Sequence, residues 1–109
     1  MKDKTLHEVC EAFGVTRRAV QGYENAGLVS ASGRNERGHL LYNEECQRRI
    51  QQIKFYRDMG FKVKEIKELL NASDSDLKEA LEKQVRRLAD EKEQKEILIE
   101  QVHVLIKNI

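Results

Sequence analysis

No glycine or proline occurs between Ser73 and Ile109, the last third of this 109-residue chain. With Ser73 as a capping residue, this composition predicts one uninterrupted helix over about residues 75–108. At 1.5 Å per residue, such a helix is about 50 Å long, which exceeds what a small domain can cover with its own surface. The chain is therefore expected to fold as a small first domain followed by one extended helix.

Apolar side chains recur at heptad spacing along this predicted helix, on both sides of a polar middle at residues 89–96. A solvated lone helix would leave that stripe in water, so a coiled-coil partner is the better interpretation. An antiparallel pair of helices places the two polar middles together at the two-fold axis. We expect a homodimer in which the contacts come from Leu81, Val85, Leu88, Leu98, Ile99, Val102, Leu105 and Ile106.

The rest of the composition favours a mainly helical, strongly solvated protein, with 36% charged residues, 6% aromatic residues and neither proline nor tryptophan. No apolar stretch approaches the length of a membrane span, and the N-terminus lacks the apolar core of a signal peptide. We therefore expect a soluble, cytoplasmic protein with no membrane partner. Residues 1–72 carry 13 basic and 10 acidic side chains, and residues 73–109 carry 7 and 9. This asymmetry is weakly in favour of a nucleic-acid-binding first domain.

Helix start and stop signals predict two short helices at the beginning of the chain. Thr5 and Glu8 have the spacing of a capping box, and Gly14 is suited to end the first helix. Thr16 is a second N-cap, and its helix is expected to end near Ala26. Two helices joined by a turn of about three residues are typical of a helix-turn-helix, in which the second helix reads DNA. By itself, the spacing fits any helical hairpin equally well.

The next signals predict a wing and two further helices. Residues 30–38 are polar and contain glycine, as in a loop, and residues 39–42 resemble a short strand. Asn43 caps a third helix over about 44–58, Gly60 ends it, and a fourth helix closes near Asn71. The expected fold is all-α in the main: a winged helix-turn-helix over residues 1–72 with a short β wing, then a dimerisation helix over residues 73–109.

With these elements in place, the chain resembles the MerR family of bacterial transcription regulators from Thr5 to about Leu70. No single motif is strong, but their order and spacing together are highly specific. The residues that carry the resemblance are Gly14-Val15-Thr16, Arg18, Tyr23-Glu24, Gly27-Leu28, Arg34, Gly38, Leu41-Tyr42, Gly60-Phe61, Glu65-Ile66 and Leu69-Leu70.

The resemblance implies a homodimer that binds an inverted repeat in a promoter with an over-long spacer. Distortion of that double-stranded DNA realigns the promoter for RNA polymerase, which would be a further partner. The recognition helix and the wing supply the expected DNA contacts. The residues expected at the DNA are Thr16, Arg17, Arg18, Gln21, Tyr23, Arg34, Arg37, Gly38, His39 and Tyr42. The rings of Tyr23 and Tyr42 are expected to be wedged in the core, with one polar end free.

Three departures from the family pattern bear on DNA affinity. The usual Arg-Tyr before Tyr23 is replaced by Gln21 and Gly22, and the usual Tyr-Arg after the wing glycine is replaced by His39 and Leu40. The third is Lys62, which stands where the family has a capping serine. Each lost cationic phosphate contact is expected to reduce the salt dependence of binding by about one log unit. The chain is thus expected to bind DNA with fewer contacts than its relatives, or to read a different site.

No residue set is typical of an enzyme: there is no nucleophile–histidine–carboxylate combination and no phosphate-binding glycine loop. Cys10 and Cys46 lie outside the positions that metal-sensing members of the family use, so we expect neither a metal nor a cofactor. The alternative function is an architectural or protein-interaction module without promoter activation. The sequence leaves open whether an effector domain exists beyond residue 109.

Overall fold

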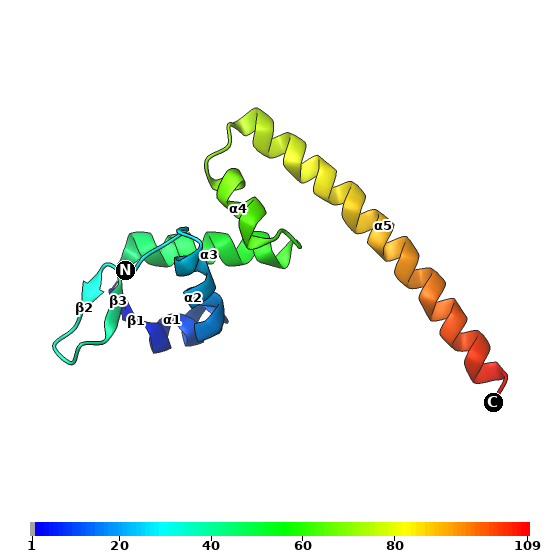
Figure 1. Ribbon diagram of the computed structural model, residues 1–109, viewed down its shortest axis with the longest axis horizontal. Coiled ribbons are helices and arrows are strands. Elements are labelled where there is room, and N and C mark those ends of the chain that lie inside the picture. The colour runs from blue at the N-terminus through cyan, green and yellow to red at the C-terminus, as the bar shows by residue number, and fades with distance from the viewer. Residues whose placement is uncertain (1) are drawn as a thin grey trace. The chain divides into compact units, whose positions relative to one another are not determined.

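The computed structural model describes residues 2–109 and separates into two compact units, one up to Asn71 and one over Ala72–Ile109. Within residues 2–71, the first unit contains three short strands and four helices (Figure 1). The second unit is built on a single long helix. This arrangement confirms the predicted fold class, a mainly helical winged helix-turn-helix with a long C-terminal helix.

The helix-turn-helix forms where the capping signals predict it. Helix α1 (Leu6–Phe13) begins at the Thr5 capping box: Oε1 of Glu8 accepts a hydrogen bond from the Thr5 backbone N–H at 2.9 Å. This bond is the main reason that the pKa of Glu8 lies below its usual value. Gly14 ends the helix with a φ of +65°, a left-handed conformation that favours glycine. Helix α2 (Arg17–Asn25) follows, and Oγ1 of its N-cap Thr16 accepts from the Ala19 N–H at 3.0 Å.

A three-stranded antiparallel sheet lies beside these helices, in the order β1-β3-β2. Strand β3 (Leu40–Tyr42) is central, and strand β2 (Gly33–Arg34) pairs with it to form the wing. Strand β1 (Lys4–Thr5) pairs with the other edge of β3, with Lys4 opposite Tyr42. The sequence predicts β3 but not β1, because two residues are too few to show an alternating pattern.

Helices α3 (Glu44–Asp58) and α4 (Val63–Leu70) complete the first unit. Oδ1 of Asn43 accepts from the Cys46 N–H at 2.9 Å and so caps α3 as predicted. Lys62 occupies the N-cap position of α4, where Oε1 of Glu65 accepts from its backbone N–H at 3.0 Å. Helix α3 packs on α2 and β3, and α4 packs on α3. The core of the unit consists of Val9, Val20, Tyr23, Leu28, Tyr42, Ile50, Ile53, Phe61 and Ile66.

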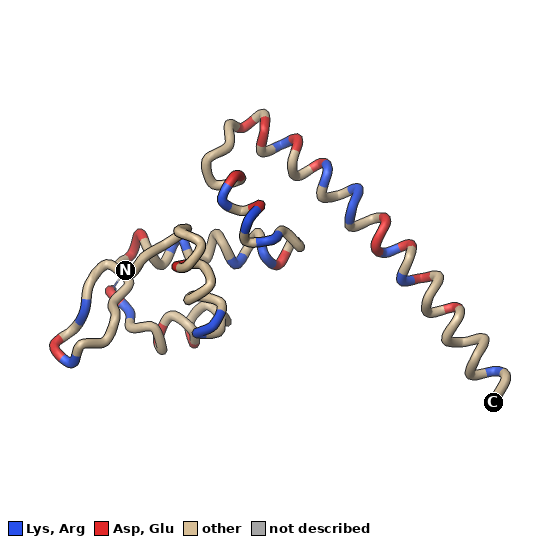
Figure 2. The backbone as a smooth tube through the Cα atoms, viewed as in Figure 1, with Lys and Arg blue, Asp and Glu red and all other residues tan. Residues whose placement is uncertain are grey.

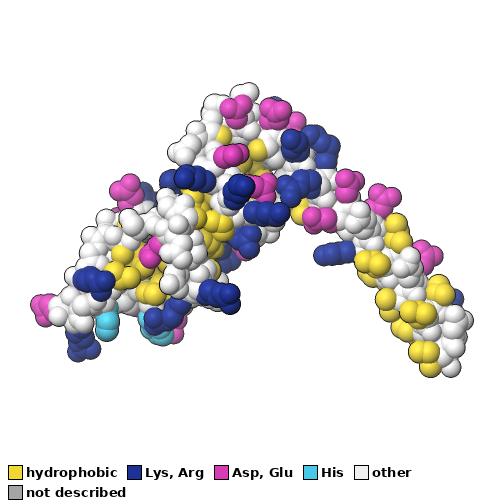
Figure 3. Space-filling view, viewed as in Figure 1, with side chains coloured by type: hydrophobic (Ala, Val, Ile, Leu, Met, Phe, Trp, Pro, Cys, Tyr) yellow, Lys and Arg dark blue, Asp and Glu magenta, His cyan; other side chains and the backbone are white. Residues whose placement is uncertain are grey.

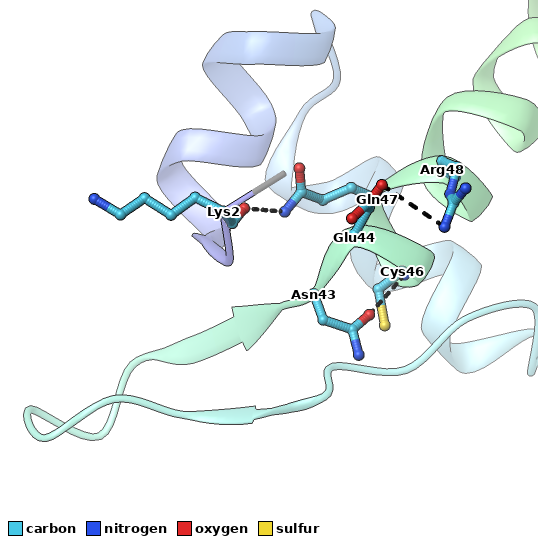
Figure 4. A network of polar contacts seen from close by, with 6 residues as sticks. All are labelled: Lys2, Asn43, Glu44, Cys46, Gln47 and Arg48. Carbon is cyan, nitrogen blue, oxygen red and sulfur yellow. Dashed lines mark hydrogen bonds and ion pairs between the residues drawn. The ribbon is translucent and has the colours of Figure 1, made fainter.

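Gln47 is a polar side chain within this core, fully buried on the first turn of α3. Its Nε2 donates to the backbone oxygens of Lys2 and Tyr42, both at 2.8 Å. Figure 4 shows the bond to Lys2 beside the Asn43 cap. Oε1 of Gln47 has no hydrogen-bond partner among residues 2–109. These two hydrogen bonds from the Gln47 side-chain amide connect the N-terminal segment and the end of β3 to α3.

Helix α5 (Asp74–Lys107) starts one residue before the predicted position, with Oγ of Ser73 accepting from the Asp76 N–H at 3.1 Å. Charged residues alternate along its first part, whereas apolar side chains gather toward its C-terminal end (Figures 2 and 3). Leu81 is half-buried and Leu88 is exposed. The other residues of the predicted dimer stripe are 53–66% exposed: Val85, Leu98, Ile99, Val102, Leu105 and Ile106.

Candidate nucleic-acid interface

Helix α2 presents a polar face to solvent and an apolar face to the core. Val20 and Tyr23 are buried, whereas Arg17, Arg18 and Gln21 are exposed. The start of α2 is basic (Figure 2). Residues three or four positions apart share one face of a helix, so Gln21 lies on the same face as Arg17 and Arg18. An α-helix with this face fits the major groove of B-DNA, where guanidinium and amide groups can reach base edges.

Asn35 organises the tip of the wing. Its Oδ1 accepts from the backbone N–H groups of Arg37 and His39, both at 3.0 Å. Its own backbone N–H donates to the His39 oxygen at 2.9 Å, and its oxygen accepts from the Gly38 N–H at 2.9 Å. Gly38 takes a φ of +82° to close this turn. Asn35 is not among the residues predicted from the sequence, although an asparagine three residues before a glycine is a recognisable turn signal.

The basic residues of the wing differ in what they contact. Nη1 of Arg34 donates to the Gly38 oxygen at 2.6 Å, so this side chain braces the wing. The side chains of Arg37 and His39 are exposed. The wing therefore offers Arg37 and His39 to a ligand, and Arg34 both holds the turn and contributes charge.

A hydrogen bond between Tyr42 and Glu24 connects the wing strand to the recognition helix. The Tyr42 hydroxyl donates to Oε1 of Glu24 at 2.5 Å. Burial raises the pKa of Tyr42 well above its usual value, and the neighbouring Glu24 adds to this effect. Tyr42 is 1% exposed and Tyr23 is 4% exposed. The rings of both tyrosines are thus packed in the core, as the sequence favours.

Replacing Tyr42 with phenylalanine is expected to lower the free energy of unfolding at pH 7 by about 1–2 kcal/mol, since a bond to a charged acceptor is lost. The raised pKa of the folded-state hydroxyl has a further consequence. Tyrosine in the unfolded chain ionises near pH 10, so the stability that neutral Tyr42 contributes is lost as the pH rises above about 10. Urea denaturation at pH 7 and pH 10.5 measures both effects. Equal pH dependence in Tyr42→Phe and the parent would contradict the assignment.

Gly22 is the unusual residue of the recognition helix. A Cβ added at this position would meet nothing within 4 Å, and the backbone has no positive φ. Neither packing nor backbone geometry in the protein requires glycine here. Gly22→Ala is therefore expected to raise the free energy of unfolding by about 0.5–1 kcal/mol, through helix propensity alone. Thermal unfolding tests this, with Gly27→Ala as the contrasting variant: Gly27 has a φ of +75°, so that substitution should destabilise.

The described residues hold no group of three or more histidine, cysteine or acidic side chains that could bind a metal ion. The Cys46 thiol donates to the Ser30 backbone oxygen at 3.2 Å. Among residues 2–109, no helix is both long and apolar enough to cross a membrane. The exposed polar face of α2 and the wing together form a candidate binding surface.

Two short helices joined by a tight turn, α1 and α2, together with a wing formed by β2 and β3, define a winged helix-turn-helix protein. Two family models match the chain: "MerR HTH family regulatory protein" over residues 4–73 and "MerR, DNA binding" over residues 47–104. This chain belongs to the MerR family of helix-turn-helix regulatory proteins.

Named relatives agree with this assignment. The chain is 37% identical over 83 residues to the nodulation protein NolA of Bradyrhizobium diazoefficiens, covering 76% of this chain and 35% of NolA. It is 34% identical over 97 residues to the HTH-type transcriptional activator mta of Bacillus subtilis, covering 89% of this chain and 38% of mta. The chain thus spans little more than a third of the length of these relatives.

A solved structure is similar over nearly the whole chain. The N-terminal part of the Bacillus subtilis multidrug transporter activator, MtaN, superposes with a TM-score of 0.74 at 31% identity. The match covers 94% of this chain and 97% of MtaN. The fold shared by the two proteins includes the long C-terminal helix.

Proposed function

We propose that this protein binds double-stranded DNA as a homodimer and regulates transcription by distorting a promoter. The exposed face of α2, flanked by the wing, is the observation that carries the proposal. Its DNA contacts come from Thr16, Arg17, Arg18, Gln21, Arg34, Arg37, Gly38 and His39. Membership of the MerR family supports this function, and the relative mta is a transcriptional activator by name.

The two units divide this task. Residues 1–72 form the DNA-binding domain, and residues 73–109 form the dimerisation helix. Antiparallel pairing of α5 places Lys92 and Lys95 near Glu91 and Glu93 of a second copy, whereas parallel pairing aligns like charges. A two-fold dimer calls for an inverted repeat in the DNA, and RNA polymerase at the same promoter is the further partner. Such a regulator is not an enzyme, needs no cofactor, and works in the cytoplasm.

An architectural role is the second candidate, in which the same module bridges DNA without activating a promoter. The observation in its favour is the absence of arginine at Gln21 and Leu40 and of a ring at Gly22. A regulator should bind a selected duplex at least about 10³-fold more tightly than a random duplex of equal length. An architectural protein should show little preference.

Arg18→Ala tests the recognition face. We expect it to weaken binding to a duplex selected from a random library by about 1–3 kcal/mol, the range for one good side-chain contact. Fluorescence anisotropy at fixed salt measures the change. The matched control is Arg48→Ala, which removes the same charge from α3, where Arg48 lies 3.8 Å from Glu44. An equal loss of DNA affinity in the two variants would mean that α2 is not the element that recognises DNA.

A further inference from the structure

A hollow of about 680 Å³ lies between helix α3 and the segment that connects α2 to the wing. We call it the α3 groove, and its lining residues are Leu28, Val29, Ser30, Glu45, Cys46, Arg48, Arg49 and Gln52. Four of them are spaced three or four positions apart and so share one face of α3, namely Glu45, Arg48, Arg49 and Gln52. None of the lining residues is among the proposed DNA contacts, so the α3 groove is a separate surface.

Arg49 is the cation that both walls of the α3 groove hold in place. Its Nε donates to the backbone oxygen of Leu28 at 3.1 Å, which connects α3 to the opposite wall and restrains the guanidinium. Its two terminal amino groups make no further hydrogen bond within residues 2–109. A restrained guanidinium with both of these groups available can bind a carboxylate through two parallel hydrogen bonds.

Arg48 adds a second positive charge on the same face. Its Nη2 lies 3.8 Å from Oε1 of Glu44, in an exposed ion pair that a ligand can displace at little cost (Figure 4). Glu45 is the one carboxylate among the lining residues, and it lies toward the N-terminal end of α3. Two arginines against one glutamate favour an anion near Arg49 and Gln52.

The opposite wall offers backbone donors beside apolar surface. Val29 and Ser30 belong to no helix or strand, and they precede the edge strand β2. Their backbone N–H groups make no hydrogen bond with residues 2–109. Leu28 and Val29 supply apolar side chains to the same wall. Unpaired backbone groups next to an apolar surface are a common binding site for the main chain of an extended peptide.

The length of the α3 groove fits a short segment. From Glu45 to Gln52, the helix rises by about 10 Å at 1.5 Å per residue. An extended peptide rises by about 3.3 Å per residue, so about three peptide residues span this wall.

We propose that the α3 groove binds a short, extended, acidic peptide segment of a partner protein. A carboxylate of the segment pairs with Arg49 and Arg48, and a peptide carbonyl accepts from the free N–H of Val29 or Ser30. The partner can bind while DNA occupies α2 and the wing, because the two surfaces share no residue. Peptide binding goes beyond the proposed DNA-binding function and does not depend on it.

The test measures binding of a fluorescein-labelled six-residue peptide, in which glutamate alternates with leucine, to the full chain by fluorescence anisotropy. A peptide with glutamine in place of glutamate should bind at least about tenfold more weakly, since it lacks the charge-assisted hydrogen bonds. In nitrogen-15-labelled protein, the acidic peptide should shift the amide resonances of Val29 and Ser30 and the Nε–H resonance of Arg49. No binding, equal binding of the two peptides, or shifts confined to other residues would overturn the proposal.

Gln52→Glu and Gln51→Glu are a matched pair of variants. Both glutamines are exposed on α3, but Gln52 lines the α3 groove and Gln51 lines a different hollow beside α1. Neither side chain makes a hydrogen bond within residues 2–109, so both variants should fold, which thermal unfolding checks. Gln52→Glu should weaken binding of the acidic peptide by about tenfold through like-charge repulsion, and Gln51→Glu by about twofold or less. Equal weakening by the two substitutions would overturn the proposal.

Two further variants separate the α3 groove from the DNA-binding surface. Arg49→Lys keeps the charge but loses the planar guanidinium, and it should weaken binding of the acidic peptide by about tenfold. Arg18→Ala removes a charge from the exposed face of α2 and should leave the affinity for the peptide unchanged. A loss of peptide affinity in Arg18→Ala that matches the loss in Arg49→Lys would place the peptide on the DNA-binding surface and overturn the proposal.

Discussion

Gln47→Glu is expected to destabilise the first unit strongly, lowering the free energy of unfolding by about 3–5 kcal/mol at pH 7. The Gln47 amide donates to the backbone oxygens of Lys2 and Tyr42, both at 2.8 Å, from a fully buried position. A carboxylate there would be a buried charge facing two acceptors, with no donor to offer either of them. Urea denaturation followed by circular dichroism measures the loss.

The pH dependence of this variant separates charge from packing. Near pH 4 the new carboxyl is protonated and can donate one hydrogen bond, so part of the stability should return. The control Gln47→Leu removes the donors without adding charge, and it should lose only about 1–3 kcal/mol at either pH. If Gln47→Glu and Gln47→Leu were equally destabilised at pH 7, the buried charge would not cause the extra loss, and the account of this position would be contradicted.

The double substitution Ile99→Glu with Val102→Glu is expected to give monomers and to weaken DNA binding by about 100-fold or more. Both side chains lie in the exposed apolar stripe of α5, at 55% and 53% exposure. Charges on that stripe would have to be desolvated in a dimer, whereas in a monomer they stay in water. A monomer reaches only half of an inverted repeat, which removes the gain from binding two half-sites at once.

Residues on the opposite face of α5, within the same turns, provide the control. Ile97 and Val104 are about as exposed, at 51% and 52%, but at 100° per residue they lie on the other side of α5 from Ile99 and Val102. Ile97→Glu with Val104→Glu should therefore remain dimeric. Light scattering on both double variants reports the mass directly. Monomers from both pairs, or dimers from both, would contradict the assignment of the stripe.

The helices could be predicted from sequence because their boundaries depend on local signals. Thr5, Thr16, Asn43 and Ser73 each carry a side-chain oxygen that accepts from the N–H three residues ahead. These bonds are made within one turn, so the sequence contains the whole cause. Strand β1 could not be predicted, because its hydrogen bonds are made with β3, which lies far along the chain.

The candidate interface could be predicted only in part, for the same reason. The basic residues of α2 and the wing follow from helical periodicity and from the family pattern. Whether a tyrosine faces DNA or the core depends on tertiary packing, and Tyr23 and Tyr42 proved to be buried. The bond from Tyr42 to Glu24 joins residues distant in sequence. No local pattern encodes such contacts.

Selection of binding sites from a random duplex library tests the central claim most directly. The full, unmodified chain is incubated with the library at fixed salt and pH, and the retained duplexes are sequenced over several rounds. The account predicts enrichment of one inverted repeat, with two half-sites at a constant spacing, bound by two copies of the chain. Recovery of unrelated sequences without a repeat, or of a single unpaired half-site, would contradict a dimeric, sequence-reading regulator.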